Sequence, residues 1–156
     1  MAEGTEYYTI RFSAEAVQLV FFRYGLDQWL QALDWPEAER VDVILAVSEA
    51  STNAVEHAYP VGEPGEVEVV GRLVLGQTDR HVVIAVRDWG TWQGSDSDGY
   101  GLTAVRACMA RVRIRHDADG TLVTMSSRPV PQAAAVAPQP RSSAEDEPVR
   151  PRLRRI

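Results

Sequence analysis

Residues 43–59 contain a row of polar side chains within a stretch that is otherwise mostly small or apolar. Glu49, Asn53 and His57 recur at intervals of four, so on an α-helix a carboxylate, an amide and an imidazole lie along one face. The small and apolar residues between them indicate that this face packs against another part of the fold. Polar groups in such a setting need partners, and a bound ligand with its metal can supply them.

The composition indicates one globular domain followed by a tail of different character. A chain of 156 residues, 45% of them hydrophobic, is long enough for one core but short for two. We expect residues 1–128 to form the domain and residues 129–156, which hold six of the nine prolines, to form a disordered tail. The net charge of −6 argues against direct nucleic-acid binding. No apolar run is long enough for a membrane span and the N-terminus lacks a signal core, so we expect a cytoplasmic protein.

The chain has no lysine, because all 16 of its basic residues are arginine. P-loop enzymes and eukaryotic-type protein kinases place a lysine on the nucleotide phosphates, and Schiff-base catalysis also requires one. These mechanisms are therefore excluded. Cys108 is the only cysteine, which excludes an intrachain disulfide and a cysteine-rich zinc site, and we expect it in the core.

The apolar pattern predicts helices early in the chain and strands mostly later. We expect a strand at 6–12, a helix from Ser13 as N-cap to about residue 33, and a second helix from Pro36 to about residue 59. The apolar positions of the first helix are Val17, Val20, Phe21, Tyr24 and Leu30. Strands at 66–75 and 81–87, a helix at 99–109 and a hairpin of strands 111–115 and 121–126 follow. This order predicts an α+β two-layer sandwich.

Asp88 and Gly90 follow the apolar strand segment 82–86. A carboxylate at the end of a buried strand can accept a hydrogen bond from a ligand amine, such as the exocyclic amine of adenine. The glycine lets the backbone approach the ligand closely. The alternative is that Asp-x-Gly forms an ordinary turn.

Two further motifs contain glycine. Gly99-Tyr100-Gly101-Leu102 opens the third predicted helix, where backbone N–H groups and the helix dipole attract an anion. A simple junction between loop and helix explains this motif equally well. Gly120-Thr121 enters a late strand and either belongs only to a hairpin turn or directs the threonine hydroxyl into a pocket.

In this order, the four motifs resemble those of the GHKL nucleotide-binding superfamily, which includes the ATPase domains of gyrase and of histidine kinases. The segment Glu-Ala-Ser-Thr-Asn-Ala-Val-Glu-His-Ala-Tyr at 49–59 is similar to the anti-sigma-factor serine/threonine kinase branch. The resemblance covers about residues 6–127. It implies a two-layer α/β sandwich of the Bergerat type, with a mixed, mainly antiparallel sheet and helices on one face.

The resemblance implies roles for the polar row on the second helix. Asn53 would coordinate the Mg²⁺ that bridges the phosphates of ATP, and Glu49 would polarise the attacking hydroxyl or water. His57 would contact a phosphate or, alternatively, cap backbone carbonyls at the helix end. His81 and His116 receive no role.

The other motifs would bind the nucleotide itself. By resemblance, Asp88 holds the adenine amine, Gly90 leaves room for the base and Thr121 supports it. Gly99 and Gly101 cradle the phosphates through their backbone N–H groups. The complete phosphate-binding motif implied is Gly99, Tyr100, Gly101 and Leu102.

The implied function is an ATP-dependent serine/threonine protein kinase that sequesters a sigma factor and phosphorylates a small anti-sigma antagonist. Related kinases often form homodimers. The lid at 93–98 carries two aspartates and no basic residue, which is unfavourable near a triphosphate unless a cation intervenes. A second hypothesis is therefore a nucleotide-binding interaction module without kinase turnover. A third, a GHKL-like fold that binds no nucleotide, is disfavoured by the presence of all four motifs.

Overall fold

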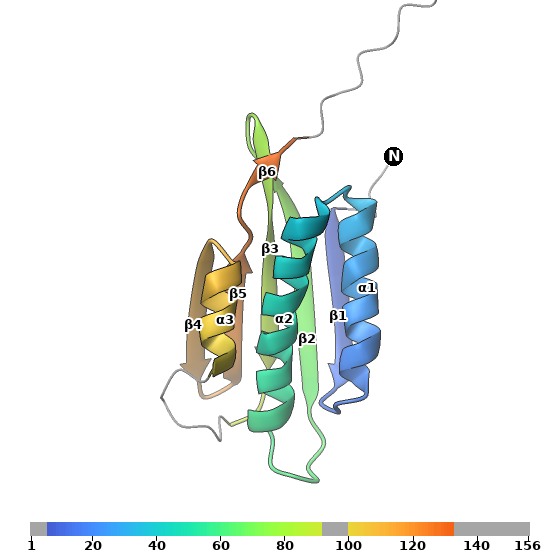
Figure 1. Ribbon diagram of the computed structural model, residues 1–156. Coiled ribbons are helices and arrows are strands. Elements are labelled where there is room, and N and C mark those ends of the chain that lie inside the picture. Colours follow the sequence, from blue (N-terminus) through green and yellow to red (C-terminus); the bar gives the residue numbers. More distant parts are fainter. Residues whose placement is uncertain (1–5, 92–99, 133–156) are drawn as a thin grey trace, which may run out of the picture.

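Three helices lie side by side on one face of a six-stranded sheet (Figure 1). The computed structural model describes residues 6–91 and 100–132. The strand order is β1-β2-β3-β5-β4, and β6 also pairs with β3. The predicted α+β two-layer sandwich with helices on one face is confirmed. Every strand pairing within the described residues is antiparallel, which agrees with the expected mainly antiparallel sheet but adds no parallel pair to it.

The predicted helices and strands are all present, although their ends differ by a few residues. Their bounds are β1 Tyr7–Ser13, α1 Gln18–Ala32, α2 Glu37–His57, β2 Glu66–Leu75, β3 Asp79–Asp88, α3 Tyr100–Cys108, β4 Arg111–Asp117, β5 Gly120–Ser126 and β6 Val130–Pro131. The short β6 was not predicted. It pairs with Asp79 and Arg80, so the described sheet continues past the expected domain end at residue 128. None of the described helices is both long and apolar enough to cross a membrane.

Helix α1 begins later and buries a different face than the sequence predicts. Ser13 is the last residue of β1 and not the N-cap, and the helix has no side-chain cap. The buried residues of the helix are Leu19, Phe22, Leu26, Trp29 and Leu30. The other predicted apolar positions are exposed, at 56% for Val17, 63% for Val20, 64% for Phe21 and 69% for Tyr24. Because both faces are apolar, periodicity alone does not show which one meets the sheet.

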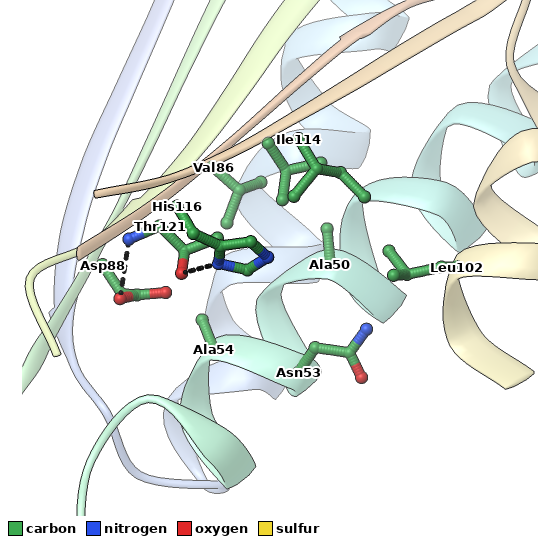
Figure 2. Close-up of a pocket in the computed structure, with 10 residues that line it drawn as sticks. Ala50, Asn53, Ala54, Val86, Asp88, Leu102, Ile114, His116 and Thr121 are labelled. Atoms are coloured by element: carbon green, nitrogen blue, oxygen red, sulfur yellow. Dashed lines mark hydrogen bonds between the residues drawn. The ribbon is translucent and has the colours of Figure 1, made fainter. Parts of the chain in front are cut away.

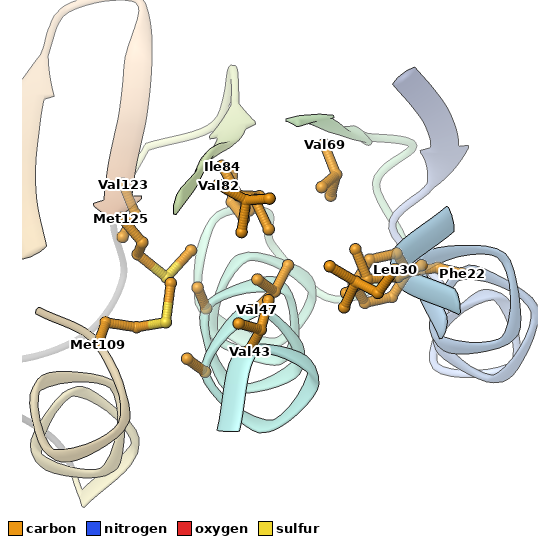
Figure 3. Close-up of a cluster of buried hydrophobic side chains, with 14 of the residues drawn as sticks. Phe22, Leu30, Val43, Val47, Val69, Val82, Ile84, Met109, Val123 and Met125 are labelled. Carbon is orange, nitrogen blue, oxygen red and sulfur yellow. The ribbon is translucent and has the colours of Figure 1, made fainter. Parts of the chain in front are cut away.

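Helix α2 packs against the sheet and α3 with a row of small buried residues. Ala46, Ala50, Ala54 and Ala58 recur at intervals of four, and each is at most 4% exposed. Valines of the same helix point toward Val82 and Ile84 of β3 (Figure 3). Between α3 and the sheet, the side chains of Met109 and Met125 point toward one another and join the same core. Cys108 is partly buried against this core.

Arg80 ties the connection between α1 and α2 to the sheet. Its guanidinium donates to the carbonyl oxygens of Leu33 and Asp34 and lies 5.1 Å from the centre of the Trp35 ring. Asp34 has a φ of 50°, the left-handed conformation that lets the chain turn out of α1. The carbonyls at a helix C-terminus carry partial negative charge, so a buried cation is compatible with this position.

We expect the substitution R80M to lower the free energy of unfolding by about 2–3 kcal/mol, because two carbonyl acceptors lose a charged donor. Urea denaturation followed by tryptophan fluorescence measures the change. The matched control is R72M, on an exposed residue of β2, which should change stability by no more than about 0.5 kcal/mol. If R80M and wild type had the same free energy of unfolding, the role given to Arg80 would be contradicted.

Candidate functional site

A pocket lies between α2, α3 and the ends of β3, β4 and β5 (Figure 2). Its apolar lining residues are Ala50, Ala54, Val86, Leu102, Ile114 and Val123, and its polar lining residues are Asn53, Asp88, His116 and Thr121. Mostly apolar walls with a few converging polar groups are typical of a small-molecule site. Apolar walls are chemically suited to the faces of a flat ring, and polar groups are suited to its edge.

Strand register places three of these polar residues in one row. Asp88 of β3 is paired with Thr121 of β5, which is in turn paired with His116 of β4. Residues directly opposite each other on neighbouring strands share a face of the sheet, with Cβ atoms about 4.5–5.5 Å apart. The row therefore faces the helix layer, and Asn53 approaches the same pocket from α2.

Asp88 is a buried carboxylate, only 3% exposed, at the end of β3. Its Oδ1 accepts hydrogen bonds from the backbone N–H of Gly90 at 3.1 Å and of Thr121 at 3.2 Å. Within residues 6–91 and 100–132, no donor is assigned to Oδ2. Burial raises the pKa of Asp88, while the two backbone hydrogen bonds and the charges of His116 and Arg87 act in the opposite direction. The backbone thus orients the carboxylate through Oδ1, and Oδ2 is able to accept a hydrogen bond from a ligand.

Two glycines let the backbone close around this carboxylate. A Cβ on Gly90 would overlap the carbonyl oxygen of Ala58, the C-cap of α2. A Cβ on Gly120 would overlap the carbonyl oxygen of Asp88, and Gly120 also has a φ of +128°. Beside the role expected for Gly90 in making room for a base, the structure therefore gives it a packing role against α2.

Tyr59 links three segments behind the site. Its hydroxyl donates a hydrogen bond to the carbonyl oxygen of Glu66 at 2.6 Å and accepts one from the backbone N–H of Trp89 at 3.0 Å. The segment after α2 is thereby fastened to the start of β2 and to the residue that follows β3. This arrangement fixes the position of Asp88 relative to α2.

The predicted polar row on α2 is only partly in the pocket. Asn53 lines the pocket and projects from α2 on the side of α3 (Figure 2). Glu49 and His57 share its helix face and are partly buried, but they are not among the described lining residues. His57 Nε2 lies 3.8 Å from the carboxylate of Glu56 at the end of the helix. The roles inferred for Glu49 and His57 stay predictions.

The predicted phosphate-binding motif lies at the start of α3. The helix begins at Tyr100, so Gly101 is in its first turn, where backbone N–H groups have no partner within the helix. Leu102 lines the pocket. Gly99, the lid at 93–98 and the side chain of Tyr100 lie outside the described part of the structure.

His116 is the pocket residue that the sequence analysis missed. Its Nδ1 lies 2.9 Å from Oγ1 of Thr121. Two sequence signals could have found it: alternation along β4 puts it on the same face as Val112 and Ile114, and the hairpin around Asp119-Gly120 pairs it with Thr121. The prediction that His116 has no role took neither into account.

The donor set fits a magnesium nucleotide better than a metal held by protein alone. No group of three or more His, Cys, Asp or Glu side chains among the described residues is placed to hold a metal. Mg²⁺ is often bound through few protein oxygens, with phosphates and waters completing its shell. The amide oxygen of Asn53 can serve as such a ligand.

Comparisons with known proteins agree with this geometry. A family model described as a histidine kinase-like ATPase domain matches residues 12–127. The crystal structure of the RsbU and RsbW domains of Rv1364c from Mycobacterium tuberculosis is similar, with a TM-score of 0.66 and 28% sequence identity over 80% of this chain. The match covers 33% of the chain in that crystal structure.

The raised pKa of Asp88 predicts that its ionised carboxylate destabilises the ligand-free fold. The folded state holds this proton more tightly than the unfolded state does, so the stability from the group is present at low pH and lost as the pH rises through the folded-state pKa. D88N can keep both backbone hydrogen bonds without the charge. We expect D88N to unfold at a higher urea concentration than wild type at pH 7, with the difference vanishing below about pH 4.

Urea titrations at a series of pH values measure this effect, with the exposed D119N as a control that should leave stability nearly unchanged. A D88N protein that is less stable than wild type at neutral pH would contradict the prediction, as would a difference that does not depend on pH.

Proposed function

This chain belongs to the histidine kinase-like ATPase family, and from that premise we propose that it binds ATP with Mg²⁺ and acts as an anti-sigma-type serine/threonine protein kinase. The observation that carries the proposal is the pocket that brings Asp88, Thr121 and Asn53 together between α2 and the sheet. The sequence resemblance at 49–59 and the similarity to a structure that contains an RsbW domain support this branch of the family. A cytoplasmic location is part of the proposal.

Asp88 is suited to bind the adenine amine. An ionised carboxylate only accepts hydrogen bonds, and Oδ1 already accepts two from the backbone. Oδ2 is therefore the atom we assign to the amine. Val86, Ala54 and Ile114 supply apolar surface for the faces of the base. Thr121, directly opposite Asp88, presents its hydroxyl at the same edge, and Gly90 allows the backbone to lie close by.

The phosphates are proposed to lie at the N-terminal end of α3. Backbone N–H groups of the first helical turn, including that of Gly101, and the helix dipole favour an anion there. Gly99, Tyr100 and Leu102 belong to the same proposed motif. Asn53 would hold the Mg²⁺, which neutralises charge on the phosphates during transfer.

Glu49 is proposed as the catalytic residue. It lies one helical turn before Asn53, and its carboxylate can accept the proton of a serine or threonine hydroxyl on an antagonist protein. Phosphoryl transfer depends mainly on positioning and charge neutralisation, so one oriented carboxylate is sufficient protein chemistry. His57, one turn after Asn53, is proposed to contact a phosphate or to cap the end of α2.

The second candidate function is a nucleotide-binding interaction module without kinase turnover. The two aspartates and the lack of basic residues at 93–98 favour it, because nothing in that segment would neutralise a γ-phosphate. The absence of Glu49 from the described pocket lining also favours it. In this case the nucleotide would act as a structural ligand or a switch.

The partners we propose are a sigma factor, a small anti-sigma antagonist and a second copy of this chain. The exposed α1 stripe, defined as Val17, Val20, Phe21 and Tyr24, supports a homodimer. Its spacing of three, one and three residues places all four side chains on one side of the helix. Exposed apolar clusters of this kind often mark protein interfaces.

We expect E49Q to bind Mg-ATP like wild type but to transfer phosphate to an antagonist at least about 100-fold more slowly, because the base is lost. Calorimetry measures binding, and radiolabelled ATP with a candidate antagonist measures transfer. E56Q, an exposed change on the same helix, is the matched control and should behave like wild type. D88N should weaken binding at least about tenfold. Tight binding by wild type without transfer to a confirmed antagonist partner would favour the interaction module.

We expect F21E to shift a concentration-dependent dimer toward monomer, because a charge in the centre of the exposed α1 stripe opposes its burial. Sedimentation velocity over a range of protein concentrations measures the shift. R23E, an exposed change outside the stripe, serves as the control. A wild-type protein that stays monomeric at every concentration tested would contradict the homodimer.

A further inference from the structure

His116 and Asp88 are the only titratable side chains among the described residues that line the pocket. The imidazole lies at the exposed end of β4 and extends over the pocket toward α2 (Figure 2). Its Nδ1 is 2.9 Å from Oγ1 of Thr121, and Thr121 is itself paired with Asp88. A group that changes charge thus contacts the hydroxyl beside the ligand-binding carboxylate.

The hydrogen bond between His116 and Thr121 has two possible directions. A protonated imidazole carries N–H groups on both nitrogens and only donates, so Oγ1 of Thr121 accepts and its own proton is free for a ligand. A neutral ring can instead accept at Nδ1. The Thr121 hydroxyl then donates to the ring and presents only lone pairs to the pocket. Protonation therefore fixes Nδ1 as the donor to Thr121, whereas a neutral ring allows either direction, depending on its tautomer.

Adenine distinguishes these two states. Its amine donates a hydrogen bond, and the adjacent ring nitrogen N1 accepts one. The carboxylate of Asp88 can only accept, which matches the amine and leaves N1 in need of a donor. Thr121 supplies that donor when His116 donates to it.

We propose that His116 is a positioning residue that makes adenine-nucleotide binding depend on pH, with tighter binding when the ring is protonated. This inference rests on the proposed function of the pocket as an ATP site. At lower pH, protonation of Asp88 removes the acceptor for the amine and opposes the effect.

The surrounding groups leave few other sources for such a pH effect. On β3 the titratable lining residue is Asp88, and β5 contributes Thr121 and Val123. The described lining residues of α2 and α3 are Ala50, Asn53, Ala54 and Leu102, none of which titrates. On β4, Arg115 and Asp117 flank His116 and alternate to the opposite face of the sheet.

The test compares the full-length wild type with H116N at about pH 6 and about pH 8. Asparagine can donate or accept a hydrogen bond but does not titrate. Calorimetry gives the affinity for Mg-ATP and for Mg-1-deaza-ATP, in which a C–H group replaces N1. The terminal phosphate of ATP also titrates near pH 6, but its contribution to the pH dependence of binding is the same for wild type and H116N. We expect wild type to gain about three- to tenfold more affinity for ATP than H116N does on acidification, with no such extra gain for 1-deaza-ATP.

Equal pH dependence of wild type and H116N would overturn the role of His116. An extra gain that persists with 1-deaza-ATP would also overturn it, because the effect would not pass through N1. If H116N does not fold, as judged by urea denaturation, H116Q serves in its place. Wild type that binds no ATP at either pH would overturn the proposed function as well, whereas ATP binding without the pH difference would overturn only this inference.

Discussion

The close approach of α2 to the sheet is the constraint on which the rest of the structure depends. Four alanines at intervals of four are buried along α2 and its C-cap, and Gly90 lies against the backbone of Ala58 at the helix end. Because the helix lies so close, Asn53 on α2 and Asp88 on β3 reach the same pocket. Ala50 and Ala54 also form part of its wall, so a larger side chain there would fill the pocket and move the helix.

Asp88 departs from ordinary core packing, because it continues the buried apolar residues Val82, Ile84 and Val86 of β3 with a carboxylate. A buried carboxylate is unfavourable unless its oxygens are satisfied. The backbone of Gly90 and Thr121 satisfies one oxygen, and burial still raises the pKa of the group. A ligand amine would donate a hydrogen bond to the other oxygen. The fold thus accepts a local loss of stability in the empty state at the position where we propose that the adenine amine binds.

Features set by local pattern could be predicted from the sequence, and features set by pairing between distant elements could not. The spacing of Glu49, Asn53 and His57 predicted one helix face, and the apolar run before Asp88 predicted a carboxylate at a strand end. The buried face of α1 could not be predicted because Phe21 and Phe22 offer apolar surface on both sides. The polar row shares a helix face, but the pocket reaches only Asn53, since its extent depends on how α3 and three strands meet α2. His116 is different, because the alternation along β4 and the hairpin that pairs it with Thr121 could have indicated it, but neither was taken into account.

The short strand β6 determines where the chain leaves the described structure. It pairs with Asp79 and Arg80 at the start of β3, whereas Asp88 lies at the other end of that strand. At about 3.3 Å per residue, the two ends of β3 are about 30 Å apart. The last described residues therefore lie at the end of the sheet opposite the pocket. A probe attached at Pro131, which is exposed, would lie far from Asp88 and leave the pocket open to small molecules.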